Sequence, residues 1–461
     1  MRAADRWDLL DDLLARAASL IREWEGGFGA YEVHPASRPD PVRLEGAWRA
    51  FADRMAAHYP FFHPRYAGQM LKPPHPVAVA GYLAAMLVNP NNHALDGGPG
   101  TSALEKEVVA DLASMFGLPD TALGHLTSSG TIANLEALWV ARELRPGARV
   151  VHSAGAHYTH ARMCQVLGMP SEAVPAGPDG RIDLDAVEAA CRRGGVGTVV
   201  LTPGTTGLGA VDPIHEALEL RERYGVRLHV DAAYGGFFTL LARGPDPLVA
   251  PEPFAAIAGC DSVVVDPHKH GLQPYGCGAV LFADPAVGRL YRHDSPYTYF
   301  TSDDLHLGEI SLECSRAGAA AAGLWLTLRV LPLARDHGLG AILAAGRRAV
   351  LAAARRVGRS DVLTLHVSPE LDILTCFPTS RRLSDIDARS AAVMAAGMAD
   401  ADPLFVSVLT VDAEAMAARH PDVVVDAPAA RILRSVLMKP EHEPAVDQLV
   451  DGLERLVVGT R

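Results

Sequence analysis

Cysteine is scarce in this chain, whose 461 residues include only six: Cys164, Cys191, Cys260, Cys277, Cys314 and Cys376. They form no CxxC pair and lack the density of a disulfide scaffold. The scarcity excludes the class of small, disulfide-stapled secreted domains. We therefore expect a protein of the reducing cytoplasm.

Positive charge is also in short supply. The 42 Lys and Arg residues are outnumbered by 54 Asp and Glu residues, which gives a formal net charge of -12, and the basic residues do not cluster. A protein that binds the phosphate backbone of a nucleic acid needs a basic face. We therefore expect no nucleic-acid partner.

Long hydrophobic runs are missing as well. The longest, residues 317–328, contains Thr327 and stops at Arg329, well short of the ~20 apolar residues that span a bilayer. The first twelve residues contain four aspartates, whereas targeting peptides avoid acids or need an apolar stretch. We expect neither a membrane segment nor a targeting segment.

What remains is the composition of a soluble globular protein, with 49% hydrophobic and 21% charged residues. From residue 104 onward, helical patterns alternate with short β-branched runs at 148–152, 198–202, 226–230, 262–265 and 278–282. Such alternation predicts an α/β fold with a mostly parallel, doubly wound sheet.

Three segments are predicted: an N-terminal helical segment (1–58), a large α/β domain (59–334) and a smaller C-terminal α+β domain (335–461). The first holds one amphipathic helix that stops at Gly26, with an apolar stripe suited to a partner subunit or to its own chain. The stretch 59–100 is rich in Pro, His, Asn and Gly, which predicts loops.

Lys269 lies in the segment 266–271, just beyond a strand that the sequence predicts to be buried. Burial lowers the pKa of a lysine, which is how its amine becomes a nucleophile that forms a Schiff base near neutral pH. The alternative is a lysine that extends from the strand end to the surface. The rest of the chain decides between the two.

Asp231 ends a second apolar run and is followed by the small residues Ala232 and Ala233. Ligands of open α/β sheets bind at the carboxyl ends of the strands. An aspartate placed there can pair with the protonated ring nitrogen of a cofactor and keep the ring an electron sink. Its alternative role is the N-cap of a helix.

The segment 125–134 runs from a short strand into a helical pattern, with Ser129, Gly130 and Thr131 at the junction. A helix N-terminus offers free backbone N–H groups and a positive dipole end to a phosphate. The segment lacks the Gly-Lys-Ser/Thr of a nucleotide-binding loop, so a single phosphate ester is the better ligand. An ordinary helix cap is the alternative.

His157 opens a further helical pattern, and its ring could stack on a planar cofactor. Together with His160 and Cys164 it lies roughly on one helix face, which raises the possibility of a metal site. No acid and no further Cys or His completes the set that zinc needs. We expect no metal.

Taken together and in this order, these motifs resemble the pyridoxal-dependent decarboxylases of the glutamate, tyrosine and aromatic amino acid group. The resemblance runs over about residues 60–325. It rests on the Ser-Gly-Thr-x-Ala-Asn loop at 129–134, the His-Tyr-Thr at 157–159, the Pro-Gly-Thr-Thr-Gly at 203–207, the Asp231 strand end, His268-Lys269 and Ser315-Arg316. It implies the aspartate aminotransferase-type fold (fold type I), pyridoxal 5'-phosphate as cofactor and an amino acid as substrate. We expect a homodimer.

The resemblance also implies roles for single residues. Lys269 is the Schiff-base lysine and Asp231 is the partner of the ring nitrogen. His157 is the ring stacked on the cofactor, with Ala233 against the opposite face. The residues implied to hold the phosphate or lie near the ring oxygen are Ser129, Gly130, Thr131 and His268 for the phosphate, and Thr205 or Thr206 for the oxygen.

An arginine and a tyrosine complete the expected site. Relatives offer an arginine of the C-terminal domain to the substrate carboxylate, and Arg434 stands at that place, with a salt bridge as its alternative role. A loop tyrosine of relatives supplies a proton after carbon dioxide leaves. Here Tyr297 is preferred to Tyr299 because Pro296 restricts the backbone beside it. The alternative is that both rings fill a dimer interface.

The expected activity is decarboxylation of an L-amino acid to its amine, with an aromatic substrate such as tyrosine favoured. Ala103 stands where many members carry an acid, and His270 follows the lysine where several animal enzymes have Trp or Tyr; microbial tyrosine and aspartate decarboxylases resemble this chain more in the latter respect. The alternatives are an aspartate or glutamate decarboxylase, an aminotransferase or a carbon–carbon lyase of the sphingosine-phosphate lyase type, and a cofactor-binding protein without turnover.

Overall fold

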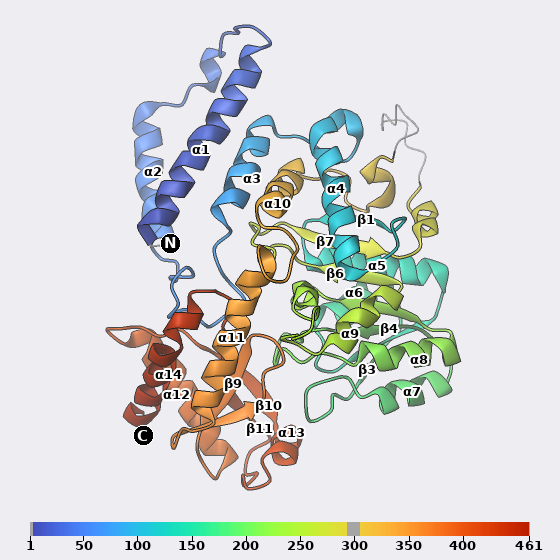
Figure 1. Ribbon diagram of the computed structural model, residues 1–461, viewed down its shortest axis with the longest axis vertical. Helices are drawn as coiled ribbons and strands as arrows, with labels where there is room; N and C mark the ends of the chain where they lie inside the picture. The colour runs from blue at the N-terminus through green and yellow to red at the C-terminus, as the bar shows by residue number, and fades with distance from the viewer. Residues whose placement is uncertain (1–2, 293–304, 461) are drawn as a thin grey trace.

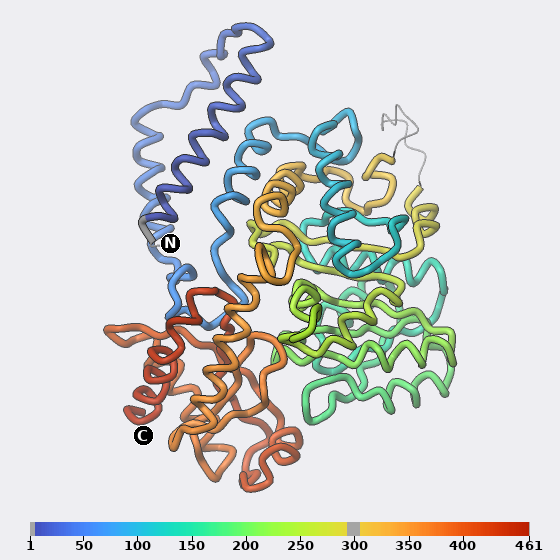
Figure 2. The backbone as a smooth tube through the Cα atoms, viewed as in Figure 1, coloured from blue at the N-terminus to red at the C-terminus, as the bar shows by residue number. Residues whose placement is uncertain are grey.

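The structure is a computed structural model, and it describes residues 3–292 and 305–460. In this part of the chain, a seven-stranded sheet with its helices forms a larger body and a four-stranded sheet with its helices forms a smaller one (Figure 1). Helices α1 and α2, at the N-terminus, lie beside α3 of the larger body and extend beyond it at one end (Figure 2). The predicted α/β fold with a smaller C-terminal domain is confirmed.

Five strands of the large sheet match the β-branched runs of the sequence, β1 is the short strand predicted in the segment 125–134, and β3 is added at one edge. The strands are β1 (Leu123–Thr127), β2 (Arg149–Ser153), β3 (Ser171–Val174), β4 (Val196–Leu201), β5 (Arg227–Asp231), β6 (Ser262–Val265) and β7 (Gly278–Phe282). Their order in the sheet is β1-β7-β6-β5-β4-β2-β3. All neighbours from β6 to β3 are parallel, whereas β7 is antiparallel to both β6 and β1. The sheet is therefore mostly parallel, as expected.

Strand β6 shows why this sheet is covered on both faces. Val263 and Val265 pack into the main core, whereas Val264 packs with Ala133 and Ala137 of the helix that follows β1. Because side chains alternate across a strand, a strand that is apolar at every position needs cover on both sides. The polar residues therefore lie beyond the ends of the strands, at the carboxyl edge of the sheet.

The sequence patterns predicted some helices of the larger body and missed others, among them α3. The helices are α3 (Pro76–Val88), α4 (Pro99–Phe116), α5 (Gly130–Leu144), α6 (Thr159–Leu167), α7 (Leu184–Arg192), α8 (Ile214–Tyr224), α9 (Pro251–Ala255) and α10 (Gly318–Val330). The prediction of loops throughout 59–100 is wrong where α3 lies. Pro76 occupies the first helical position, where no N–H is needed, and the His75 side chain accepts the N–H of Val77. The apolar residues after this cap pack against α10.

The predicted amphipathic helix is confirmed as α1 (Ala3–Gly26), and α2 (Pro41–Met55) follows it. Helix α1 packs on α3 of its own chain, but Ala17 is its only described residue that is buried. Trp7 and Trp24 remain exposed, and no residue of α2 is buried. The chain therefore covers only part of the apolar surface of these two helices.

The smaller body follows residue 335 and also takes in a segment from early in the chain. Its elements are α11 (Leu339–Val357), β8 (Leu363–Val367), β9 (Ile373–Pro378), α12 (Leu383–Ala399), β10 (Ser407–Asp412), α13 (Ala413–Arg419), β11 (Ala429–Val436) and α14 (His442–Gly459). Its sheet is antiparallel, in the order β10-β11-β9-β8. The backbone of Ala67 bonds to Phe405 and Val436, so part of the proposed segment 59–334 pairs with this body.

Candidate active site

A cavity of about 260 Å³ opens at the carboxyl edge of the large sheet. Its walls come from the residues that follow β1, β2, β4, β5 and β6. The residues lining it are Ser129, Gly130, Thr131, Asn134, His157, Tyr158, Thr159, Thr202, Gly204, Thr206, Asp231, Ala233, Tyr234, Asp266, His268 and Lys269. Five motifs that lie far apart in the sequence thus meet in one place, which is where open α/β sheets bind ligands.

Lys269 lies in the turn after β6 and carries an ion pair. Its Nζ is 3.0 Å from Oδ2 of Asp266, which is buried. Burial alone would lower the pKa of this amine, but the charge and hydrogen bond of Asp266, with a smaller effect of Asp231, raise it above its ordinary value. The expectation of a lowered pKa is therefore wrong for the protein without its cofactor. The nucleophilic amine requires that this ion pair be weakened.

Asp231 is the last residue of β5 and is almost fully buried. Its Oδ1 accepts the N–H of Ala233 at 3.2 Å, and its Oδ2 lies 2.9 Å from Nε2 of His160. Burial favours the neutral acid, but the hydrogen bond and charge of His160 and the charge of Lys269 outweigh it and hold the pKa below its ordinary value. The next helical turn begins only at Gly236, so Asp231 caps no helix.

The N-terminus of α5 provides a cradle for a phosphate. Ser129 is the N-cap, and its hydroxyl accepts the N–H of Ile132 at 3.3 Å. The N–H groups of Gly130 and Thr131, in the first turn, have no carbonyl one turn earlier in the helix and are available to an anion. A Cβ on Gly130 would lie 2.5 Å from Oδ2 of Asp266, so only glycine leaves this space open. His268 lines the same end of the cavity, with its Nδ1 2.7 Å from the carbonyl oxygen of Cys277.

His157 lies immediately before α6, where its Nδ1 is 2.7 Å from the Thr159 hydroxyl oxygen. Burial lowers the pKa of this histidine, so its ring is neutral near pH 7 and suited to stacking. His160 points elsewhere, to Asp231, and does not join His157. Among residues 3–292 and 305–460, no group of three His, Cys, Asp or Glu side chains is placed to hold a metal ion.

Of Thr205 and Thr206, only one lines the cavity, and Arg434 lies outside the cavity lining. Thr206 lines the cavity, whereas the Thr205 hydroxyl is buried and accepts the N–H of Ala210 within its own loop. Arg434 on β11 is 6% exposed, outside the cavity lining, and donates to the carbonyl oxygens of Thr206 and Gly207 at 2.7 and 3.0 Å. It holds the loop that bears Thr206. Tyr297 and Tyr299 lie outside the described residues.

Arg316 of the Ser315-Arg316 signature stabilises the end of β1, which precedes the phosphate cradle. Arg316 forms a buried ion pair with Glu105 of α4 at 2.5 Å and donates to the carbonyl oxygen of Leu126 at 2.9 Å. Glu105 in turn accepts the N–H of Leu126. The two charged side chains thus fix the end of β1, from which the cradle follows.

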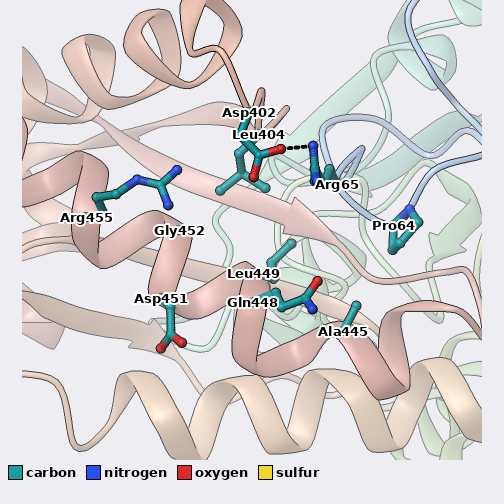
Figure 3. A pocket seen from close by; sticks show the side chains of 10 residues that line it. All are labelled: Pro64, Arg65, Asp402, Leu404, Ala445, Gln448, Leu449, Asp451, Gly452 and Arg455. Carbon is teal, nitrogen blue, oxygen red and sulfur yellow. Dashed lines mark ion pairs between the residues drawn. The ribbon is translucent and has the colours of Figure 1, made fainter.

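A larger cavity, of about 380 Å³, lies between the segment at Pro64 and helix α14 (Figure 3). Arg65 there forms an ion pair with Asp402, and Arg455 pairs with Asp400 at 3.3 Å. It contains none of the predicted site residues, and its two arginines are neutralised by acids. Chemistry rather than size therefore identifies the candidate site.

The model of the family described as "Pyridoxal-dependent decarboxylase conserved domain" matches residues 60–334. The chain belongs to this family. The match confirms the family, the cofactor and the enzyme class, carboxy-lyase, that the motifs predicted. The cavity fits pyridoxal phosphate, since it combines an open helix N-terminus, a buried carboxylate and a lysine at one sheet edge.

Curated relatives differ in the amino acid that their names give. The L-tyrosine decarboxylase of Enterococcus faecium is 30% identical over 58% of this chain and 60% of its own length. A probable L-tyrosine/L-aspartate decarboxylase of Methanoregula boonei is 32% identical over 61% of this chain and 73% of that relative. The L-2,4-diaminobutyrate decarboxylase of Rhizobium meliloti is 33% identical, over 64% and 62%.

Solved structures resemble the whole chain. The structure of mouse CSAD has a TM-score of 0.77 and 21% identity, and the match covers 92% of this chain and 89% of that one. Tryptophan decarboxylase of Catharanthus roseus, in complex with L-tryptophan, has a TM-score of 0.77 and 16% identity, with 100% and 99% covered. At these identities the likeness shows the shared fold.

Proposed function

We propose that this chain decarboxylates an L-amino acid to its amine and carbon dioxide, with pyridoxal 5'-phosphate held by Lys269. The observation that carries the proposal is the convergence of Lys269, Asp231 and His157 on one cavity. When bound, pyridoxal phosphate accepts the electron pair that the departing carboxylate leaves behind. The protein has to bind, orient and protonate.

The residues of the cavity divide these tasks. Lys269 holds the cofactor through its amine, and Asp231, kept ionised in a buried place, holds the proton on the ring nitrogen. The neutral ring of His157 and the methyl group of Ala233 are the two faces between which a flat ring is held. Ser129, Gly130, Thr131 and His268 bind the phosphate, and Thr206 is the threonine that reaches the cavity.

Two predicted roles concern the substrate. We propose that Arg434 binds the substrate carboxylate, for which one or more of its present bonds to carbonyl oxygens must be exchanged. We propose that Tyr297 donates the proton that replaces carbon dioxide. Both proposals rest on the resemblance to relatives and on the chemistry of the side chains.

For the substrate we favour an aromatic amino acid such as tyrosine. Support comes from the E. faecium and M. boonei relatives, whose names include tyrosine. Aspartate, which the second name also includes, is the next candidate, followed by diaminobutyrate and glutamate.

The test is an amino-acid panel incubated with the purified protein and pyridoxal phosphate, in which released carbon dioxide and amine are both measured. We expect equal amounts of the two from tyrosine, and neither from Lys269→Ala, which should still fold. An aldehyde product without carbon dioxide would instead identify a carbon–carbon lyase. No product from any amino acid, with cofactor bound, would leave a binding protein and contradict the proposal.

We also propose a cytoplasmic homodimer. All six cysteines are free thiols, as suits a reducing compartment. The dimer is supported by the exposed apolar side chains of α1 and α2, which include Trp7, Trp24, Trp48 and Phe51. In the described part of the chain, no helix has both the length and the apolarity needed to cross a bilayer.

A further inference from the structure

His160 makes a contact that the roles above leave unexplained. It lies in the first turn of α6 and its side chain is fully buried. Its Nε2 is 2.9 Å from Oδ2 of Asp231, a residue 71 positions later in the chain. The contact joins the helix that follows His157 to the strand end that carries the proposed partner of the cofactor ring.

Asp231 has two oxygens and a different hydrogen-bond donor for each. The N–H of Ala233 fixes Oδ1, and His160 fixes Oδ2. With Ala233 alone, the carboxylate could turn about its terminal torsion, which has a broad energy well. With both donors present, its plane is set before any ligand arrives.

The available hydrogen bonds determine which nitrogen of His160 carries the proton. An ionised carboxylate only accepts, so Nε2 is the donor. Among the described residues Nδ1 is buried without a hydrogen-bond partner, and a buried N–H without an acceptor is unfavourable. Nε2 is therefore the ring nitrogen through which His160 contacts Asp231.

The neighbouring histidines do not compete for this contact. The rings of His152 on β2 and His229 on β5 lie 6.2 and 6.3 Å from the His160 ring. Burial lowers the pKa of both, that of His229 to about 3, so both are neutral. His229 is turned towards Ser262 and Asn134. The charged neighbour of this group is Lys269, which forms an ion pair with Asp266.

We propose that His160 is a positioning residue, which holds the Asp231 carboxylate in the orientation in which it meets the ring nitrogen of bound pyridoxal phosphate. It acts through Asp231 and does not touch the cofactor. The inference rests on the proposed function, because it needs the cofactor at Lys269. A histidine that merely fills space in the core would affect stability alone.

Two substitutions of His160 separate these roles. His160→Phe keeps a ring of similar size and removes the donor, whereas His160→Gln can place an amide N–H near the position of Nε2. The matched control is His366→Phe, at a histidine of the smaller body that is also buried and contacts His420. Thermal unfolding of each variant shows how much packing is lost.

Equilibrium dialysis with pyridoxal phosphate should give a dissociation constant roughly tenfold or more above wild type for His160→Phe, because a hydrogen bond to a charged group is lost. His160→Gln should restore most of the affinity, and His366→Phe should equal wild type. For the amino acid decarboxylated by wild type, kcat should fall in His160→Phe while KM stays nearly constant. Wild-type affinity and kcat in His160→Phe would overturn the inference and leave the proposed function standing.

The protein without cofactor provides an independent measurement. In ¹⁵N NMR spectra of histidine-labelled protein, His160 should carry a proton on Nε2, and Asp231→Asn should shift the signal of that nitrogen. An Nε2 without a proton would overturn the inference whether or not His160→Phe folds. If wild type instead binds no cofactor while His160 shows the expected proton, the proposed function fails, and the positioning role fails with it.

Discussion

At the scale of single residues, Asp266 disfavours the neutral form of Lys269 that the proposed chemistry needs. The lysine must be neutral to bond with the cofactor aldehyde, yet the carboxylate 3.0 Å away favours its charged form. Asp266 also borders the phosphate cradle, where a negative charge repels the incoming phosphate. Asp266 thus disfavours both the bond to the cofactor aldehyde and the binding of the cofactor phosphate, until its ion pair with Lys269 is rearranged.

We expect Asp266→Asn to capture the cofactor aldehyde at lower pH than wild type. Burial by itself acts to lower the pKa of Lys269, and Asp266 makes the largest of the contributions that raise this pKa above its ordinary value. Without that charge, the pH midpoint of capture should fall by about one unit or more. The measurement is visible absorbance against pH with pyridoxal, which lacks the phosphate and so reports the amine alone. Asp179→Asn, at an exposed acid outside the cavity, is the control, and an unchanged midpoint in Asp266→Asn would refute the assignment.

At the scale of elements, the start of α5 matters more than the rest of the helix. Helix α5 is held by its apolar face against β6 and β7, so its position does not depend on its first residue. Gly130 is needed for another reason: its missing side chain leaves room for the Asp266 carboxylate beside the cradle. Cofactor binding and helix stability are therefore separable here.

Gly130→Ala should bind pyridoxal phosphate at least tenfold more weakly while the protein stays folded, because the new methyl group displaces Asp266 and with it Lys269. Helix propensity alone would favour alanine by about 1 kcal/mol. Gly100→Ala is the matched control, since Gly100 also lies in the first turn of a helix but has no atom within 4 Å of an added Cβ. Equal dissociation constants for both variants and wild type would show that the cradle does not need its glycine.

At the scale of the whole molecule, α1 and α2 expose more apolar surface than a monomer needs. Trp48 is 64% exposed and Phe51 is 52% exposed on a helix with no buried residue. Large exposed apolar patches mark sites of association. These exposed side chains support the proposed homodimer.

We expect sedimentation velocity to show wild type at twice the mass of one chain and Trp48→Glu shifted towards the monomer, because a charge in an apolar interface is costly. Val458→Glu, at a 52% exposed residue of α14, should remain dimeric. A wild-type monomer at micromolar concentration would contradict the homodimer.

Local pattern was enough to predict the strand ends and helix starts that carry the candidate chemistry. Asp231 and Lys269 each follow an apolar run, and Ser129 and Gly130 precede a helical one. Such signals predict well because strand, turn and cap preferences act over a few residues. The helix α3 was missed because a proline at its first position resembles a loop signal.

The sequence by itself determined the family, most of the sheet and most of the residues that line the candidate cavity. Tertiary structure alone decided how those residues are charged and held. The pKa of Lys269 rises because Asp266 is near enough to outweigh burial, and His160 meets Asp231 across 71 positions. Hydrogen bonds and charge interactions depend on distances between side chains from separate elements, and no local pattern encodes those distances.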